Sequence, residues 1–395
     1  MTHAGPPFAL FENRLAQPGE AAGWLFEDYA GSWQGHGAGL GAALARARAE
    51  GWWAVARLDY ELGRELEPAC GLPAPAAPTV RLLFFGRRRA LFGPAVEAVL
   101  ARRLAALPPG QRHFRLSGLH TPWTEARYRD AIARIHAYIR AGDCYQINLT
   151  FPVDFRLDGH PLALYMALRQ RQPARYGGIV LDGDGTVLSL SPELFVEQAG
   201  DRLLTCPMKG TAARHPDPAA DRAAASALQA CPKNRAENLM IVDLLRNDLG
   251  RLAQAGSVRV KELFAVEPYP SVWQMVSWIE ARLADPALAP ERLLAALFPC
   301  GSITGAPKLR AMQIIDELEA APRGLYTGAF GWFAPSGDLR LNVAIRTLQI
   351  DAAGHGRMGI GSGVVHDSVA SDEWAECWLK ARFLSGLAEA AAVSS

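Results

Sequence analysis

The chain has 395 residues, half of them hydrophobic, so it is long enough to bury a large core. Its 41 basic and 40 acidic residues give a net charge of +1, which excludes the basic face expected of a nucleic-acid-binding protein. Six scattered cysteines without a Cys-x-x-Cys pair, a start without a signal-peptide pattern and no run near the ~20 apolar residues that span a bilayer predict a cytoplasmic protein that contacts no membrane.

The first part of the chain has the composition of a globular segment. Residues 51–58 predict a strand, residues 71–79 are a Pro/Ala-rich loop, and residues 95–106 predict a helix. The proline-rich connection after this helix is the expected boundary. We therefore predict an N-terminal subdomain at 1–115 and a second region at 122–389.

The second region carries sharper patterns. Apolar residues recur at helical spacing over 128–139, and Gly142 is typical of a helix end. Strands are predicted at 147–155 and at 177–190, the latter broken by a turn, and a long helix is predicted at 234–249.

The last third predicts four further elements. A helix should begin near Pro307, which suits a first helical position. Two strands flank the turn at 335–338, and a final helix starts near Ser371.

Lys209 follows a short strand-like run and is flanked by Met208 and a Gly-Thr step. Apolar neighbours can desolvate a lysine, which lowers the pKa of its amine and frees the neutral form as a nucleophile. A solvated lysine beside a turn is the ordinary alternative, because lysines are seldom buried.

The final helix places Glu373, Glu376 and Lys380 on one stripe. Magnesium takes hard oxygen ligands, usually one or two carboxylates plus substrate, and Glu237 is the candidate carboxylate from elsewhere in the chain. Two ordinary alternatives are a solvated Glu376–Lys380 pair and a capping box formed by Asn234 and Glu237.

Two small-residue loops are predicted, at 301–308 and at 359–363. The first runs into a helix start, where free N–H groups suit a carboxylate or phosphate, although its spacing is not that of a P-loop. The second follows a strand expected beside 342–347, from which Arg346 would point to the same region and bind a carboxylate. Turns without ligand and a surface arginine are the alternatives.

Together these motifs are similar to those of a known family. The chain resembles the chorismate-utilising enzymes, which include the anthranilate, isochorismate, salicylate and aminodeoxychorismate synthases. The matching runs occur in the family's order between about 125 and 385, and they are 142–148, 191–195, 207–211, 235–238, 243–248, 301–308, 345–347, 361–363 and the Glu373/Glu376 pair. The resemblance implies an α+β fold of two packed antiparallel β-sheets with helices on the outside, as one large body, and makes 122–389 the chorismate-binding catalytic region.

Position 209 separates the branches of this family. Anthranilate synthases carry an alanine there, whereas aminodeoxychorismate synthases resemble this chain in carrying a lysine. The resemblance therefore implies amination of chorismate to 4-amino-4-deoxychorismate for para-aminobenzoate and folate synthesis. Anthranilate synthase component I and a non-catalytic chorismate-binding subunit stay open as alternatives.

The resemblance also implies roles for individual residues. Lys209 would attack C2 of the chorismate ring as a covalent nucleophile while Glu193 protonates the departing C4 hydroxyl, and ammonia would then add at C4. Mg²⁺ is the implied cofactor, with Glu237, Glu376 and Glu373 as its ligands. The residues implied to hold the substrate are Arg346, Tyr326, Thr304, Gly361, Ser362, Gly363 and Lys380.

Two features concern what the chain lacks. Gln274 stands where many relatives carry a histidine, so an acid–base role does not transfer to this position. The sequence contains no Gly-x-Cys-x-Gly-like run for a glutaminase nucleophile. The resemblance therefore implies a separate glutamine amidotransferase subunit as the partner, without which the chain would use free ammonia.

Overall fold

The computed structural model describes residues 6–269 and 272–393. Its helices are α1 (Gly37–Ala49), α2 (Leu62–Leu66), α3 (Ala95–Ala105), α4 (Glu125–Ala141), α5 (Pro161–Arg171), α6 (Pro218–Ala230), α7 (Pro232–Gly250), α8 (Pro290–Leu297), α9 (Lys308–Leu318) and α10 (Ala370–Val393). Short 3₁₀ helices lie at Pro68–Cys70, Pro109–Gln111 and Gly301–Ile303.

The strands up to the middle of the chain are β1 (Phe8–Glu12), β2 (Ala21–Gly35), β3 (Trp53–Leu58), β4 (Val80–Phe92), β5 (Phe114–His120), β6 (Gln146–Gly159), β7 (Tyr176–Asp182), β8 (Gly185–Ser191) and β9 (Leu194–Ala199). The remaining strands are β10 (Arg202–Cys206), β11 (Met208–Ala213), β12 (Arg259–Pro268), β13 (Val272–Arg282), β14 (Gly305–Ala306), β15 (Ala329–Phe333), β16 (Leu339–Val343), β17 (Thr347–Asp351) and β18 (His355–Val364).

The strands form two antiparallel halves that are joined through β1. One half follows the pairing β13–β10–β9–β16–β15–β3–β4–β2, with β11 and β12 also on β13. The other follows β7–β8–β17–β18–β6–β5. Strand β1 pairs with β2 on one side and with β7 on the other, so the two predicted sheets are hydrogen-bonded into one. The predicted α+β class is confirmed.

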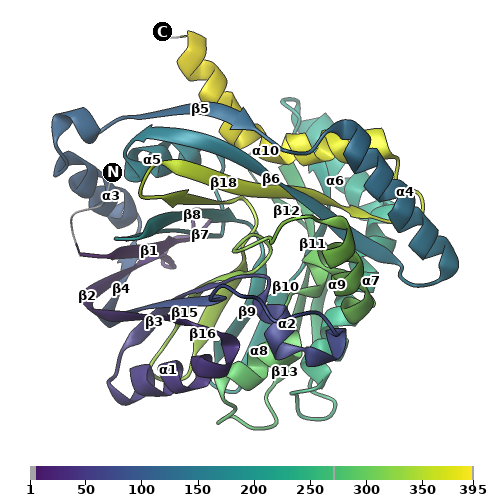
Figure 1. The fold of residues 1–395 in the computed structure, drawn as a ribbon, viewed down its shortest axis with the longest axis horizontal. Helices are drawn as coiled ribbons and strands as arrows, with labels where there is room; N and C mark the ends of the chain where they lie inside the picture. Colours follow the sequence, from purple (N-terminus) through teal and green to yellow (C-terminus); the bar gives the residue numbers. More distant parts are fainter. Residues whose placement is uncertain (1–5, 270–271, 394–395) are drawn as a thin grey trace.

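Aromatic side chains pack around Phe11 of the joining strand β1. The ring centroid of Phe11 in β1 lies 4.9 Å from that of Phe330 in β15 and 5.7 Å from that of Phe26 in β2. Helices cover the outer faces, with α1 packed on β3 and β4 and α10 packed on β18 and β5 (Figure 1). Burial of this apolar surface, at ~25 cal/mol per Å², is the main stabilising contribution to the fold.

Most predicted elements are confirmed, and their local causes are visible. Helix α4 begins after Thr124, whose hydroxyl accepts the Arg127 N–H at 3.2 Å, and ends at Gly142 with φ +81°. Strands β7 and β8 form the expected hairpin with a two-residue turn. No described helix is long and apolar enough to cross a membrane.

Two local predictions are wrong, and one of the ordinary alternatives does not hold. Residues 359–363 are the interior of strand β18, paired with β6, and not a loop; this strand runs beside β17 and not beside 342–347. Helix α7 begins at Pro232, so Asn234 lies inside it and forms no capping box with Glu237. Pro307 is the N-cap of α9 and not its first helical residue. The division at 115–122 stays a prediction.

Candidate active site

A β-bulge in β11 presents Lys209. The register between β11 and β13 shifts between Met208 and Thr211, so Lys209 and Gly210 together face a single residue of β13. Gly210 has φ +85°, and a Cβ there would lie 3.0 Å from Cγ of Asn234 in α7. Glycine suits this position on both grounds, and the bulge lets Lys209 leave the regular alternation of the strand.

The bulge is held by Gln274 in β13. The Gln274 side-chain amide donates to the Gly210 carbonyl at 2.8 Å, and its carbonyl oxygen accepts from the Thr211 hydroxyl at 3.0 Å. The residue is buried and directly opposite Thr211 in the ladder. These two hydrogen bonds have no signal in the sequence, which shows only that Gln274 stands where many relatives carry a histidine.

The Lys209 amine faces charges from three parts of the chain. Burial is the largest effect and lowers the pKa of Lys209, with the Lys380 charge acting in the same direction. Glu237 in α7, Glu376 in α10 and Glu193 between β8 and β9 oppose this shift. The neutral amine is the nucleophilic form, so the surroundings favour the chemistry that the sequence predicts.

Glu193 is buried beside the same lysine. Burial raises the pKa of Glu193 to about 7, against the opposing effects of a hydrogen bond from Ser302 and of the Lys209 charge. The Ser302 hydroxyl donates to Glu193 Oε1 at 2.6 Å. A carboxyl group with this pKa is available as a proton donor near neutral pH.

Strand β18 offers backbone N–H groups on its open edge. Gly361 and Gly363 pair with Thr150 and Asn148 of β6, yet both β6 residues donate their N–H groups elsewhere. The Gly361 carbonyl accepts from Lys380 Nζ at 2.8 Å. These pairs are therefore the non-hydrogen-bonded ones of the ladder, and the amides of both glycines point away from β6, toward the side of Lys380.

Beside Gly363, Lys209 lies close to Gln146, which is not among the predicted site residues. A Cβ on Gly363 would lie 3.1 Å from Lys209 Nζ and 3.3 Å from Nε2 of Gln146. Gln146 is fully buried, and neither polar atom of its amide has a hydrogen-bond partner in the described part of the chain. An unpaired buried amide costs ~1–3 kcal/mol, so its position here is typical of a site that receives a polar ligand.

Three carboxylates, Glu237 of α7 with Glu373 and Glu376 of α10, repel one another. Burial raises the pKa of Glu237, and the charges of Glu373 and Glu376 add to this rise. Glu373 accepts from the Ser368 hydroxyl at 2.7 Å, and Glu376 pairs with Lys380 at 2.7 Å. Within the described ranges no three His, Cys, Asp or Glu side chains already converge to hold an ion. The oxygen donors and their mutual repulsion fit Mg²⁺ in an open site that substrate oxygens complete.

Arg346 and Tyr326 are fixed by strained backbone. Arg346 has φ +49°, its carbonyl accepts from the Leu190 N–H at 3.0 Å, and its half-buried guanidinium has no ionic partner among the described residues. Thr327 has φ +60°, and the preceding Tyr326 packs its ring against Gly359. Such strain is concentrated at functional sites, and an unpaired guanidinium suits a carboxylate.

Two of the predicted substrate-binding hydroxyls are engaged within the fold. Thr304 donates to the Cys300 carbonyl at 2.8 Å, and the Ser362 hydroxyl lies 2.8 Å from that of Tyr128. Both residues are buried. Their contact with a substrate stays a prediction, as do the substrate contacts of the other predicted residues.

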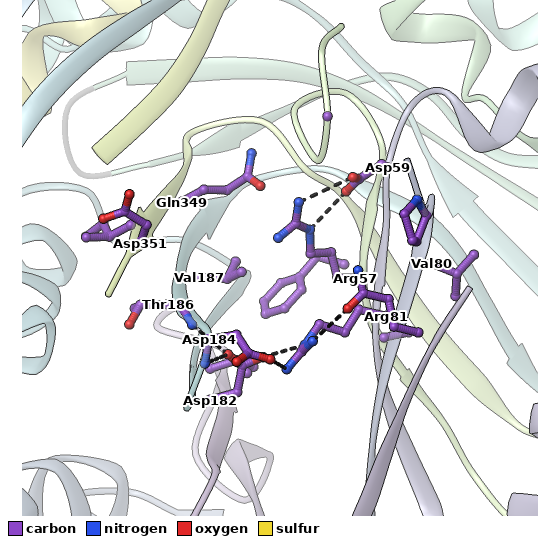
Figure 2. Close-up of a pocket in the computed structure, with 18 of the residues that line it drawn as sticks. Arg57, Asp59, Val80, Arg81, Asp182, Asp184, Thr186, Val187, Gln349 and Asp351 are labelled. Atoms are coloured by element: carbon purple, nitrogen blue, oxygen red, sulfur yellow. Dashed lines mark hydrogen bonds and ion pairs between the residues drawn. The ribbon is translucent and has the colours of Figure 1, made fainter. Parts of the chain in front are cut away.

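A cavity of about 670 Å³ lies elsewhere, between the two halves of the sheet (Figure 2). Two ion pairs lie within its lining: Arg57 with Asp59 at 2.9 Å, and Arg81 with Asp182 at 2.7 Å. None of the predicted site residues lines it. The chemistry that the sequence predicts is therefore centred on Lys209 and not on this cavity.

Comparison with known proteins shows where the chain belongs. It is 42% identical over 275 residues to aminodeoxychorismate synthase component 1 of Salmonella typhimurium, covering 69% of this chain and 60% of that protein. It is 40% identical over 276 residues to anthranilate synthase component 1 of Thermus thermophilus, covering 70% of this chain and 59% of that protein. The chain thus spans less than two thirds of either relative.

The fold has a counterpart among solved structures. The crystal structure of anthranilate synthase component I from Streptococcus pneumoniae superposes with a TM-score of 0.73 at 25% identity, covering 96% of this chain and 90% of that one. The family described as chorismate binding enzyme matches residues 40–386. With this match over most of its length and with the common fold, the chain belongs to the chorismate binding enzyme family.

Proposed function

We propose that this chain aminates chorismate to 4-amino-4-deoxychorismate in para-aminobenzoate synthesis. Relatives named for this activity and for anthranilate synthesis match at similar identity, 42% and 40%, so overall similarity does not separate the two. The observation that carries the proposal is Lys209 on its bulge, with an amine whose pKa is lowered by burial, next to an acid whose pKa is raised to about 7.

The proposed reaction uses the two groups in sequence. The neutral Lys209 amine forms a bond to C2 of the ring, both ring double bonds shift (C1=C2 to C1=C6 and C5=C6 to C4=C5), and the C4–O bond breaks. Glu193 gives its proton to the departing hydroxyl, which leaves as water. Ammonia then bonds to C4, both double bonds return to their original positions, the C2–N bond to Lys209 breaks, and the proton lost by ammonia restores the Glu193 acid.

The other polar groups are proposed to hold the substrate. The Arg346 guanidinium and the outward amides of Gly361 and Gly363 suit the carboxylates of a dianionic substrate. Glu237 and Glu376, with Glu373, would hold Mg²⁺. The ion would supply positive charge that offsets both the substrate carboxylate and the repulsion among these three side chains.

The ammonia source is proposed to be a separate glutamine amidotransferase. Relatives from Salmonella typhimurium and Bacillus subtilis are named component 1, which indicates that those proteins act with a second component. By itself, this chain should accept ammonium ions directly.

Product identification tests the proposed function. The purified chain is incubated with chorismate, Mg²⁺ and ammonium, and the products are separated and identified by mass spectrometry. We expect 4-amino-4-deoxychorismate without release of pyruvate. Anthranilate with pyruvate would identify the alternative synthase, and a chain that binds chorismate without turnover would be a non-catalytic subunit.

A further inference from the structure

Gln274 makes its two hydrogen bonds to the residues immediately after Lys209. Its amide N–H reaches the Gly210 carbonyl at 2.8 Å, and its carbonyl oxygen accepts from Thr211 at 3.0 Å. The side chain is 6% exposed, so water does not readily replace these bonds. One amide thus uses both its donor and its acceptor on a single turn of the neighbouring strand.

This turn is where the ladder between β11 and β13 is interrupted. The bulge leaves Lys209 and Gly210 opposite one residue, and the backbone of Gly210 takes the left-handed conformation with φ +85°. A bulge loses ladder hydrogen bonds, so another group must satisfy the freed carbonyl. Gln274 is that group for Gly210.

The direction of the Lys209 side chain depends on this conformation. Its amine lies against Gly363 of β18, in the other half of the sheet, and a Cβ on Gly363 would be 3.1 Å from Nζ. The bulge backbone therefore determines whether the amine reaches across to β18, and a small change in its dihedral angles would move the amine away.

We propose that Gln274 is a positioning residue that locks the bulge in the conformation presenting Lys209 to the substrate. The inference rests on the proposed role of Lys209 and extends it to a residue with no ionisable group. It also gives a function to the position where the family resemblance leads one to expect a histidine: hydrogen bonding to the turn and not proton transfer.

Three variants separate the two hydrogen bonds. Gln274→Met keeps the length of the side chain and removes both bonds. Gln274→Glu keeps the acceptor for Thr211 but, when ionised, has no donor for Gly210. Thr211→Val removes the other bond from an exposed position and leaves Gln274 bound to Gly210. Gln254→Met is the matched control, because Gln254 donates to the Leu283 carbonyl at 3.1 Å beyond the far end of β13.

Each variant is compared with the wild-type chain in two measurements. Steady-state kinetics with chorismate and saturating ammonium gives kcat and KM, and hydrogen–deuterium exchange gives the protection of residues 208–213. For Gln274→Met and Gln274→Glu we expect faster exchange in this segment alone and a kcat lower by on the order of 100-fold, with little change in KM, since the amine is misplaced while the binding groups remain. Thr211→Val should lie between these variants and the wild type, and Gln254→Met should match the wild type.

Either of two outcomes would overturn the inference. One is a wild-type kcat for Gln274→Met, and the other is a lower kcat for this variant with unchanged hydrogen–deuterium exchange at 208–213. If Gln274→Met does not fold, Thr211→Val decides the question by the same two readouts. A wild-type chain that makes another product would refute the proposed function instead, and the exchange comparison would still show whether Gln274 holds the turn.

Discussion

At the scale of single residues, burial shifts the pKa values of Lys209 and Glu193 in opposite directions, and both shifts favour the neutral form. Removing either group from water disfavours its charged form, so the pKa of the amine falls and the pKa of the carboxyl rises. Both shifts favour the neutral forms, and the proposed substitution needs a neutral nucleophile and a neutral acid. Opposite charges would otherwise make this pair an inert ion pair.

The Glu193 pKa predicts the alkaline limb of the pH profile. With a pKa of about 7, Glu193 holds its proton below that pH and loses it above, so kcat should fall as pH rises through about 7. Burial lowers the pKa of Lys209, so protonation of this amine should slow the reaction only at a lower pH than it would for an exposed lysine. The profile is measured from pH 5 to 9 at saturating chorismate.

Glu193→Gln tests the assignment of that limb. This variant has no proton to give, so kcat should fall by ~10²–10⁴-fold and the limb near pH 7 should disappear. An alkaline limb that persists in Glu193→Gln would assign the acid to another group.

The neighbours of Lys209 were predicted unevenly from the sequence. Lys209, Glu193 and Glu237 are ionisable residue types within motifs of the family, so the sequence alone predicts them. In the structure both carboxylates act electrostatically on the Lys209 amine. Gln146 and Gln274 are amides whose importance lies in what surrounds them, one unpaired and one bonded to the bulge. Neither property has a local sequence signal, because both depend on contacts between distant segments.

At the scale of elements, the site is built by one bulged strand, one glycine-rich strand and two helices. The sequence predicts a loop at 359–363, within β18, because glycine is depleted in strands. Its Gly359, Gly361 and Gly363 recur with a period of two, which is the strand signal. The reason for them is tertiary: a Cβ on Gly359 would meet Tyr326, one on Gly361 would meet the Leu149 carbonyl, and one on Gly363 would meet Lys209 and Gln146.

The carboxylates on helices α7 and α10 lead to a prediction about the response of the chain to magnesium. Glu237→Gln removes one oxygen charge from the carboxylate cluster, so both the affinity for Mg²⁺ in the presence of chorismate and the activity should fall, by at least ~10-fold. Isothermal titration with Mg²⁺ measures the first and steady-state kinetics the second. Glu125→Gln, in an exposed pair with Arg129, is the control. A wild-type metal response in Glu237→Gln would remove this residue from the ligand set.

At the scale of the whole molecule, β1 joins the two halves of the sheet, and its last residue anchors it. Glu12 is buried against Arg169 of α5, with a 2.5 Å ion pair and a 2.6 Å hydrogen bond from Tyr165. Periodicity alone could not predict this topology, because strand order is set by contacts far apart in sequence. The α+β architecture followed from the family resemblance.

Because the ion pair between Glu12 and Arg169 is buried, removing one partner should lower the free energy of unfolding strongly. Glu12→Gln leaves the Arg169 charge buried without its main partner, and the free energy of unfolding should fall by ~3–5 kcal/mol. Urea denaturation followed by tryptophan fluorescence measures this change. Glu27→Gln breaks an exposed pair with Arg89 and should cost less than ~1 kcal/mol. Equal effects for the two variants would contradict a stabilising role for the β1–α5 contact.

The covalent role of Lys209 is tested most directly by mass spectrometry of the chain with chorismate and Mg²⁺ while ammonium is withheld. Without the second nucleophile, the intermediate should accumulate on the wild-type chain. We expect a mass increase equal to chorismate less one water, located by peptide mapping on Lys209 and absent from Lys209→Ala. An adduct of this mass on Lys209→Ala, or on another residue of the wild-type chain, would contradict the assignment.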